Sequence, residues 1–276
     1  MADKKINTIV VTGRGGSGKS TFAALSNRIL MELGWKPTLV VDSDPDESLS
    51  SMLGIDIRKH GKKTISEIFY EIVKEKRMLQ REEPGLSNTV EDILLNEALY
   101  KSSKGFDFLV LGTKWFEGCY CAPDLVLGEI MVKWSQDYEY IIVDSPAGIE
   151  HINRRINKEV KDFFNILDPS KKSFENAKIS HRLIRELSIE YENYYTIGGY
   201  LFPDKLEKLA KEQQLRYLGK ISYDEKVMDY NYEGKSLLKL PDDSPAYKSV
   251  KKIIFRAGYS KKPLSMTELL ELNESH

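Results

Sequence analysis

The sequence predicts an α/β fold, with a doubly wound, mostly parallel sheet and helices on both of its faces. Short apolar runs rich in β-branched residues alternate along the chain with helical patterns, which is typical of such a sheet. The first run leads through a glycine-rich loop into a helix, and acidic residues directly follow two later runs. We expect about seven or eight strands in one domain.

Each element is expected from a local pattern. The strands are expected within the apolar runs 6–13, 36–42, 106–112, 138–144, 163–168 and 193–199. Amphipathic patterns predict helices at 21–34, 47–53 and 124–134. Residues 56–105 are strongly charged with helical periodicity, so we interpret them as a helical insertion in a single domain of residues 1–260. Residues 261–276 are expected to form a C-terminal tail.

Composition excludes several classes of protein. The 276 residues include 41 Lys and Arg and 42 Asp and Glu, so the net charge is −1 and gives no reason to expect nucleic acid as a partner. The apolar runs are too short to cross a membrane, and the N-terminus lacks the features of a secretory signal. We therefore expect a cytoplasmic protein without a membrane partner, with its two cysteines reduced.

The glycine loop carries the strongest functional pattern. Residues 13–20 fit G-x-x-x-x-G-K-[ST] between an expected strand and an expected helix. In this P-loop, backbone N–H groups surround the phosphates, Lys19 reaches the terminal phosphates and Ser20 offers a hydroxyl to Mg²⁺. The helix adds its positive N-terminal end. The predicted nucleotide-binding residues are Gly13, Gly15, Gly16, Ser17, Gly18, Lys19, Ser20 and Thr21.

Carboxylates at the ends of two expected strands extend this site. Asp42 and Asp44 end the second run, and Asp144 ends the run at 138–144. Carboxyl ends of parallel strands meet at one edge of the sheet, where ligands bind. Asp144 stands where a Walker B acid holds Mg²⁺ through water. One of the earlier pair could instead cap the helix at 47–53, but that role does not explain both.

The extra cation Arg14 gives the loop the form G-[KR]-G-G-x-G-K-[ST], which resembles the deviant P-loop of the MinD and nitrogenase iron protein class. The resemblance implies that Arg14, in place of the usual lysine, crosses a homodimer interface to the partner's nucleotide and assists catalysis. It also implies that Asp42-Ser43-Asp44-Pro45 is the first switch. Asp42 would then support the Mg²⁺ shell, and Asp44 would position or deprotonate the attacking water.

Three later blocks narrow the resemblance to the CooC-type ATPases, which help to insert nickel into carbon monoxide dehydrogenase. The blocks are "DSPAGIEHINRR", "ILDPSKKSFENAKISHRLIREL" and the segment from "YLGKISYDEKV" to about residue 257. Gly199-Tyr200 replaces the family's usual Asn-Arg pair near the adenine. By resemblance, Tyr223 and Asp224 lie beside the base. Since no [NT]-K-x-D guanine motif is present, ATP and ADP are the expected nucleotides.

The two cysteines stand together in "EGCYCAPD", residues 117–124. Two thiolates from one chain cannot complete a four-coordinate shell, but Cys119 and Cys121 from both chains of a dimer can. Such a Cys₄ site would hold Zn²⁺ tetrahedrally, or Ni²⁺ in square-planar form. The alternative is that they pack as small apolar residues.

Three classes of function fit this pattern. The leading one is an ATP-hydrolysing metallochaperone that delivers nickel to apo carbon monoxide dehydrogenase or a related nickel enzyme. The second is an electron donor like the nitrogenase iron protein, with an iron–sulfur cluster between subunits. The third is a positioning ATPase like MinD or ParA, which would leave Cys119 and Cys121 without a role.

Overall fold

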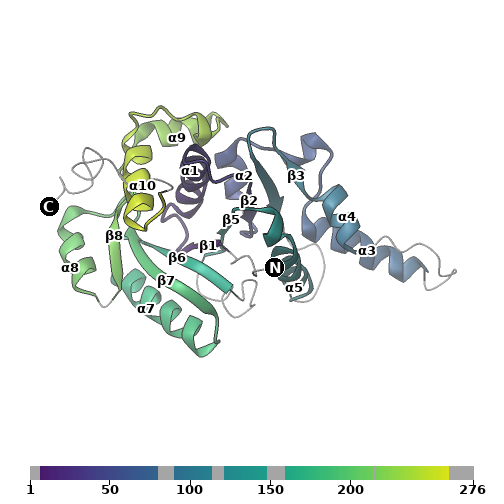
Figure 1. The fold of residues 1–276 in the computed structure, drawn as a ribbon, viewed down its shortest axis with the longest axis horizontal. Coiled ribbons are helices and arrows are strands. Elements are labelled where there is room, and N and C mark those ends of the chain that lie inside the picture. Colours follow the sequence, from purple (N-terminus) through teal and green to yellow (C-terminus); the bar gives the residue numbers. More distant parts are fainter. Residues whose placement is uncertain (1–6, 80–89, 114–120, 148–158, 214, 261–276) are drawn as a thin grey trace.

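An eight-stranded sheet forms the centre of the molecule, whose computed structural model describes residues 7–79, 90–113, 121–147, 159–213 and 215–260 (Figure 1). The strand order is β3-β4-β2-β5-β1-β6-β7-β8, and every pair is parallel except β3 and β4. The predicted doubly wound, mostly parallel sheet is thereby confirmed. Its strands are β1 (Thr8–Gly13), β2 (Thr38–Asp42), β3 (Tyr100–Lys101), β4 (Phe106–Val110), β5 (Tyr140–Asp144), β6 (Glu159–Leu167), β7 (Glu190–Gly198) and β8 (Arg216–Lys220).

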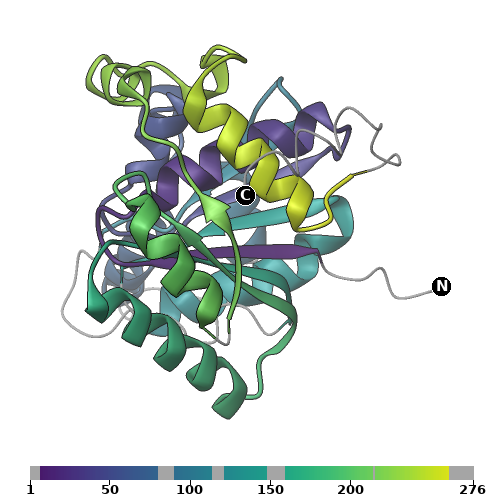
Figure 2. The ribbon, with the colours of Figure 1, turned by 90° about the vertical axis from the view of Figure 1, so that its left-hand side faces the viewer.

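Helices cover both faces of the sheet (Figures 1 and 2). On one face lie α1 (Lys19–Glu32), α2 (Ser48–Leu53), α9 (Glu225–Tyr232) and α10 (Pro245–Arg256). On the other lie α3 (Ile65–Leu79), α4 (Val90–Glu97), α5 (Cys121–Trp134) and α7 (Lys171–Glu186). The short α8 (Glu207–Glu212) packs beside β8. Helices predicted at 21–34, 47–53 and 124–134 are confirmed with small shifts of their ends.

The alternating side chains of the strands divide the core into two layers. In β1, Ile9 and Val11 belong to the cluster beneath α1 and α10, whereas Val10 belongs to the cluster beneath α5 and α7. Phe164 and Phe163 of β6 divide in the same way. Because both faces are buried, the central strands read as continuous apolar runs, which is why the sequence predicted them.

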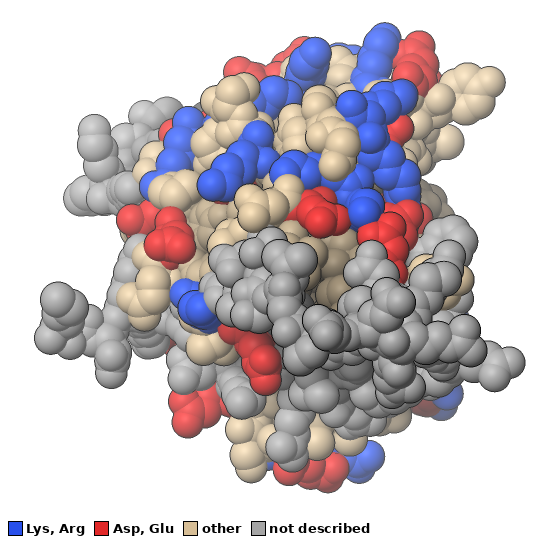
Figure 3. All heavy atoms as spheres, turned by 90° about the vertical axis from the view of Figure 1, so that its right-hand side faces the viewer, with Lys and Arg blue, Asp and Glu red and all other residues tan. Residues whose placement is uncertain are grey.

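The region 56–105 contains a 3₁₀ turn, η1 (Ile57–His60), followed by α3, α4 and β3. The first turns of α3 are anchored on the sheet by Ile65 and Ile68, both buried as their spacing predicted. Figure 3 shows that the face at the right of Figure 1 carries Lys and Arg with Asp and Glu among them. Several pair, as Lys63 does with Glu71 and Glu97. An inserted helical unit stays a prediction.

Two strands were not expected from the sequence. The edge strand β3 has only two residues and pairs antiparallel with β4, and β8 carries few apolar side chains. In the part of the chain that the structure describes, every helix is too short or too polar to span a bilayer. The predicted tail, 261–276, lies outside the described residues.

Candidate functional site

The P-loop joins the end of β1 to the start of α1, and its backbone needs glycine at several positions. A side chain at Gly13 would stand 2.6 Å from the carbonyl oxygen of Ile166 in the neighbouring strand. Gly16 and Gly18 both have positive φ, 73° and 101°, which residues with side chains rarely adopt. Ser17 closes the turn by donating its hydroxyl hydrogen to the Arg14 carbonyl at 2.8 Å. The glycines therefore give the loop the backbone conformation that it has here, and the contact of its N–H groups with phosphate stays a prediction.

A cavity of about 590 Å³ lies beside this loop. It brings together nine of the predicted site residues, which are Gly15, Gly16, Gly18, Lys19, Ser20, Thr21, Asp44, Tyr223 and Asp224. The predicted residues Gly13, Arg14, Ser17, Asp42 and Asp144 are described but do not line it. Residues that the motifs did not indicate also contribute, among them Met52, Ile221, Met228 and Asn231.

The lysine of the P-loop faces the Asp44 loop across the cavity. Lys19 is 6% exposed, and its Nζ lies 3.9 Å from Asp44 Oδ2. This is a loose ion pair, longer than a hydrogen bond. Because buried ammonium groups need a partner, the arrangement is suited to an anionic ligand that replaces Asp44 as the partner of Lys19.

The two strand-end acids, Asp42 and Asp144, differ in their bonding. Asp42 Oδ2 accepts hydrogen bonds from the N–H groups of Leu49 and Ser50 at 3.0 and 3.2 Å, and Oδ1 accepts from Asp44 N–H at 3.2 Å. It therefore holds the start of α2, which is the capping role that the sequence left open for one of the acids. Its assignment to the Mg²⁺ shell stays a prediction.

Asp144 is fully buried, and neither of its carboxylate oxygens has a hydrogen-bond partner among the described residues. Burial raises the pKa of Asp144 to about 7, while the Ser20 hydroxyl and the Lys19 ammonium act in the opposite direction. Burial and the charge of Asp144 also hold the pKa of Asp42 well above its usual range. A buried carboxylate that accepts no hydrogen bond within the described part of the chain, with a hydroxyl and an ammonium group nearby, is suited to a cation or to the water around one.

Arg14 is bonded within its own chain. Its Nη1 donates to Asp168 Oδ2 and to the Ser170 hydroxyl, both at 2.8 Å. These partners follow β6, 154 and 156 residues further along the chain, and the motif gave no sign of them. The guanidinium side chain is still 41% exposed, so the contact is a surface ion pair of small net energy. Its predicted role in a partner's site stays a prediction.

The far end of the cavity is aromatic and apolar. Tyr200, Leu201, Tyr223 and Met228 line it while remaining between 37% and 60% exposed. Gly199 lets the chain pass directly against the P-loop, because a side chain at this position would stand 2.2 Å from the Ser17 carbonyl oxygen. Tyr200 follows it and therefore lies beside the loop. Gly199-Tyr200, which stands in place of the Asn-Arg pair of the CooC-type ATPases, thus puts the Tyr200 ring against Gly18 of the P-loop. Such exposed flat groups are suited to stacking on a base.

Asp224 has structural bonds beside this end of the cavity. Its carboxylate accepts from the N–H of Lys226 at 3.0 Å, which caps α9, and from the Ser244 hydroxyl at the start of α10. It therefore joins two helices while it lines the cavity. The predicted contact of Tyr223 and Asp224 with the base stays a prediction.

The cysteine pair is described only in part. Cys119 lies outside the described residues. Cys121 is the first residue of α5, but only its backbone is described. The described residues contain no group of three or more His, Cys, Asp or Glu side chains that could hold a metal ion. The nickel or zinc site therefore remains an expectation from the sequence.

Comparison with known proteins identifies the family. Residues 8–237 match the CobQ/CobB/MinD/ParA nucleotide binding domain. The chain belongs to this family. Family membership and the P-loop together make the protein a P-loop ATPase, as the sequence predicted.

Several known proteins are similar to this chain over most of its length. An uncharacterised ATP-binding protein of Methanocaldococcus jannaschii is 32% identical over 250 residues, which is 89% of this chain and 96% of that protein. The carbon monoxide dehydrogenase accessory protein CooC of Rhodospirillum rubrum is 28% identical over 86% of this chain and 90% of its own length. The structure of Pyrococcus horikoshii MinD with Mg-ADP superposes with a TM-score of 0.61 at 17% identity, covering 92% of this chain and 96% of that one.

Proposed function

We propose that this chain is an ATP-hydrolysing metallochaperone. Two copies close on ATP and bind nickel, or zinc, through Cys119 and Cys121 of each chain. Hydrolysis then opens the dimer and releases the ion to an apo nickel enzyme, carbon monoxide dehydrogenase or a related one. The proposal is supported by the ATPase fold, by the C-x-C pair and by 28% identity to the CooC accessory protein.

The observation that carries the proposal is the position of Thr113, six residues before Cys119. Its hydroxyl donates to the Pro45 carbonyl at 2.9 Å, in the loop that carries Asp44. Leu111 N–H donates to the Asp42 carbonyl at 2.8 Å just before it. The segment that leads to the cysteines therefore starts against the nucleotide loop. Movement of that loop would be transmitted directly to this segment.

The residues around the P-loop fit a magnesium nucleotide. Ser20 and the unbonded carboxylate of Asp144 would hold the ion, with Asp42 behind them, and the ion would neutralise charge that develops on the phosphates. The MinD structure with Mg-ADP supports a magnesium nucleotide as the ligand. Lys19 would bind the terminal phosphate, and the N-terminal end of α1 would favour its negative charge.

Hydrolysis requires a water molecule in line with the terminal phosphate. We assign Asp44 to orient this water and accept its proton, because Asp44 lines the cavity opposite Lys19. Attack of the water oxygen on phosphorus breaks the bond to the leaving ADP, and inorganic phosphate is released. Once the phosphate leaves, Lys19 and Asp44 can pair again, so the loop has a different partner before and after the reaction.

The dimer completes the metal site. Two thiolates come from each chain, so the four ligands that Zn²⁺ or Ni²⁺ takes are present only when two chains meet. Metal binding would therefore require the dimer, and ATP would control it. The sequence gives no other source of thiolate ligands, since the chain has two cysteines.

The test combines metal content with molar mass. Anaerobic protein is titrated with Ni²⁺ or Zn²⁺ on a sizing column with light-scattering detection, with ATP analogue, with ADP and without nucleotide. The wild type is compared with the Cys119→Ser, Cys121→Ser double variant. We expect one metal ion for every two chains, present with the dimer and lost with the thiols. One ion per chain, or binding that survives loss of the thiols, would contradict the shared site.

A further inference from the structure

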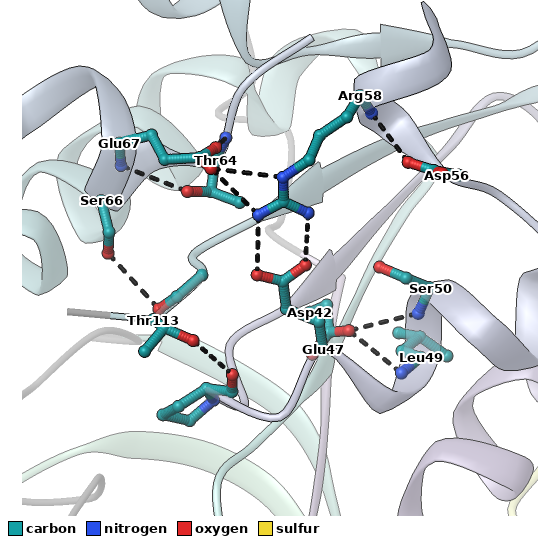
Figure 4. A network of polar contacts seen from close by, with 12 residues as sticks. Asp42, Glu47, Leu49, Ser50, Asp56, Arg58, Thr64, Ser66, Glu67 and Thr113 are labelled. Atoms are coloured by element: carbon teal, nitrogen blue, oxygen red, sulfur yellow. Dashed lines mark hydrogen bonds and ion pairs between the residues drawn. The ribbon is translucent and has the colours of Figure 1, made fainter. Parts of the chain in front are cut away.

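Glu47 ends the loop that carries Asp44, and its backbone is left-handed, with φ 51°. This conformation is uncommon for a residue with a branched or long side chain. Both terminal nitrogens of Arg58 donate to its carboxylate, at 2.9 Å to Oε2 and 3.1 Å to Oε1 (Figure 4). A two-point contact of this kind fixes orientation as well as distance.

Arg58 also binds Glu67 in the first turn of α3. Its Nε and Nη2 donate to Glu67 Oε1 at 3.2 and 3.1 Å. Glu67 Oε2 accepts from Thr64 N–H at 2.7 Å, and the Thr64 hydroxyl accepts from Glu67 N–H at 3.2 Å. This reciprocal pair caps the start of α3. Arg58 therefore lies between the loop and a capped helix end.

The start of α3, which Arg58 contacts through Glu67, is itself attached to the sheet. Ser66 N–H donates to the Leu111 carbonyl at 2.9 Å, and Ile65 and Ile68 are buried against the sheet. The carboxylates of Glu47 and Glu67 raise the pKa of Arg58, so the guanidinium keeps its charge. The Glu47 and Glu67 side chains are 20% and 22% exposed, but the Arg58 side chain is 47% exposed, so salt screens the contact in part and its value lies in its geometry more than in its net energy.

Loop 43–47 has further attachments at Ser43 and Pro45. The Ser43 N–H and hydroxyl both donate to the Asp144 carbonyl, at 3.0 and 2.8 Å, and the Pro45 carbonyl accepts from Thr113. Glu47 is held through its side chain at the other end, where the chain turns into α2. Asp44, one residue past the Ser43 attachment, thus lies between the sheet contact and the Arg58 contact.

We propose that Arg58 is a positioning residue for ATP hydrolysis. By holding Glu47 against α3, it fixes loop 43–47 and so the place of the Asp44 carboxylate opposite Lys19. Arg58 and Glu47 do not line the nucleotide cavity, so the effect is on the reaction and not on nucleotide affinity. The inference rests on the proposed role of Asp44 with the attacking water.

The chemistry explains why such a contact matters. A water that is oriented by a carboxylate reacts only when both are placed to within a fraction of an ångström. Release of Glu47 would let the loop sample other positions while the P-loop still binds the phosphates. The expected signature is therefore a loss in kcat without a change in KM.

The test is steady-state ATP hydrolysis by the full chain. For Arg58→Ala we expect kcat to fall about tenfold, with KM for ATP within about twofold of the wild type. Arg58→Lys keeps the charge but cannot make the two-point contact with Glu47, so it should recover only part of the rate. Glu47→Gln in the Arg58→Ala background should add no further loss, because the contact is already absent.

The matched control is Lys59→Ala, one residue further along η1. Lys59 is 82% exposed and pairs with Asp56 at 3.6 Å. It should leave kcat unchanged. If Arg58→Ala and Arg58→Lys both keep the wild-type kcat, or if Arg58→Ala and Lys59→Ala lose it equally, the inference is wrong. A rise in KM at constant kcat would overturn it as well.

One further variant separates this inference from the proposed function. Asp44→Asn should abolish most hydrolysis while nucleotide still binds. If Asp44→Asn keeps the wild-type kcat, the role of Asp44 fails and the inference fails with it. If Asp44→Asn loses activity but the folded Arg58 variants do not, the inference alone fails. Thermal melts followed by circular dichroism establish which variants are folded. If Arg58→Ala is not folded, the comparison is made with Arg58→Lys.

Discussion

Asp42 and Asp144 are register partners at the last residues of β2 and β5, yet within the described residues only the carboxylate of Asp42 accepts hydrogen bonds. The same residue type at the same edge of the sheet therefore has two different tasks. Asp42 accepts from the backbone at the start of α2, and Asp144 has no donor among the described residues. One acid supports structure in the free protein, and the other is the one that we propose binds a ligand.

This difference predicts opposite effects of two similar substitutions. Asp144→Asn should raise the free energy of unfolding of the metal-free protein at neutral pH by on the order of 2 kcal/mol, because a buried charge is removed. Asp42→Ala should lower it by about 1–2 kcal/mol, since the N–H groups of Leu49 and Ser50 lose their acceptor. Urea unfolding at pH 7 with chelator measures both. A loss of stability in Asp144→Asn would contradict the assignment.

The pH dependence of stability follows from the same carboxylate. The pKa of Asp144 in the folded protein is about 7, above its ordinary value of 3.8, so the folded state binds the proton more tightly. The metal-free protein should therefore lose stability as pH rises from about 4 to about 7. Asp144→Asn should flatten this part of the profile, measured as the urea midpoint at several pH values. An unchanged slope would show that Asp144 is ionised in the folded protein throughout.

The contact of Arg14 with Asp168 and Ser170 predicts a step in the formation of the dimer. If Arg14 reaches a partner's nucleotide, it must first leave Asp168 and Ser170. Asp168→Asn should then tighten ATP-dependent dimerisation by a few-fold, since an exposed ion pair is worth at most about 1 kcal/mol. Arg14→Ala should weaken it. Sedimentation with an ATP analogue tests both, and equal weakening in the two variants would contradict release of Arg14 as a step.

The aromatic end of the cavity predicts a selective loss of base binding. Tyr200→Ala should raise the dissociation constant for ADP about tenfold or more, because stacking on a base contributes about 1–3 kcal/mol. Binding of pyrophosphate should be unaffected, since the P-loop is unchanged. Tyr232→Ala is the control, because Tyr232 is 94% exposed and does not line the cavity. Calorimetry that shows equal losses for ADP and pyrophosphate would place the effect on the P-loop instead.

Gly199 gives a prediction from close packing. A side chain there would stand 2.2 Å from the Ser17 carbonyl oxygen, so Gly199→Ala must displace the P-loop or the turn after β7. We expect ADP and pyrophosphate to lose affinity together, in contrast to Tyr200→Ala. Gly61→Ala is the comparison, because its added side chain meets open space and its cost is that of a positive φ, which Gly199 does not have. Normal pyrophosphate binding by Gly199→Ala would contradict this account.

The sequence predicted the features that local patterns determine. The central strands are buried on both faces, so their apolar runs were visible, and the P-loop glycines were visible because the turn needs them. The edge strand β3 was not predicted, because two residues with one partner leave no periodicity. The same holds for β8, in which few side chains are apolar.

The bonds around the site could not be predicted, because they depend on how separate elements pack together. Arg14 and Asp168 are 154 residues apart, and Arg58 meets Glu47 and Glu67 through a turn whose shape depends on the packing of α3. In a chain with 83 charged residues, no pattern identifies which pairs will meet. Tyr200 was visible only as a departure from the family, and its ring gained meaning from its position against Gly18.

The central claim is that nucleotide and metal act through one dimer, and reciprocal binding tests it most directly. The dissociation constant of Ni²⁺ is measured with and without an ATP analogue, and that of the analogue with and without Ni²⁺. We predict that each ligand tightens the other by the same factor, because both favour the same closed state. An affinity for Ni²⁺ that is equal with and without the analogue would contradict the claim.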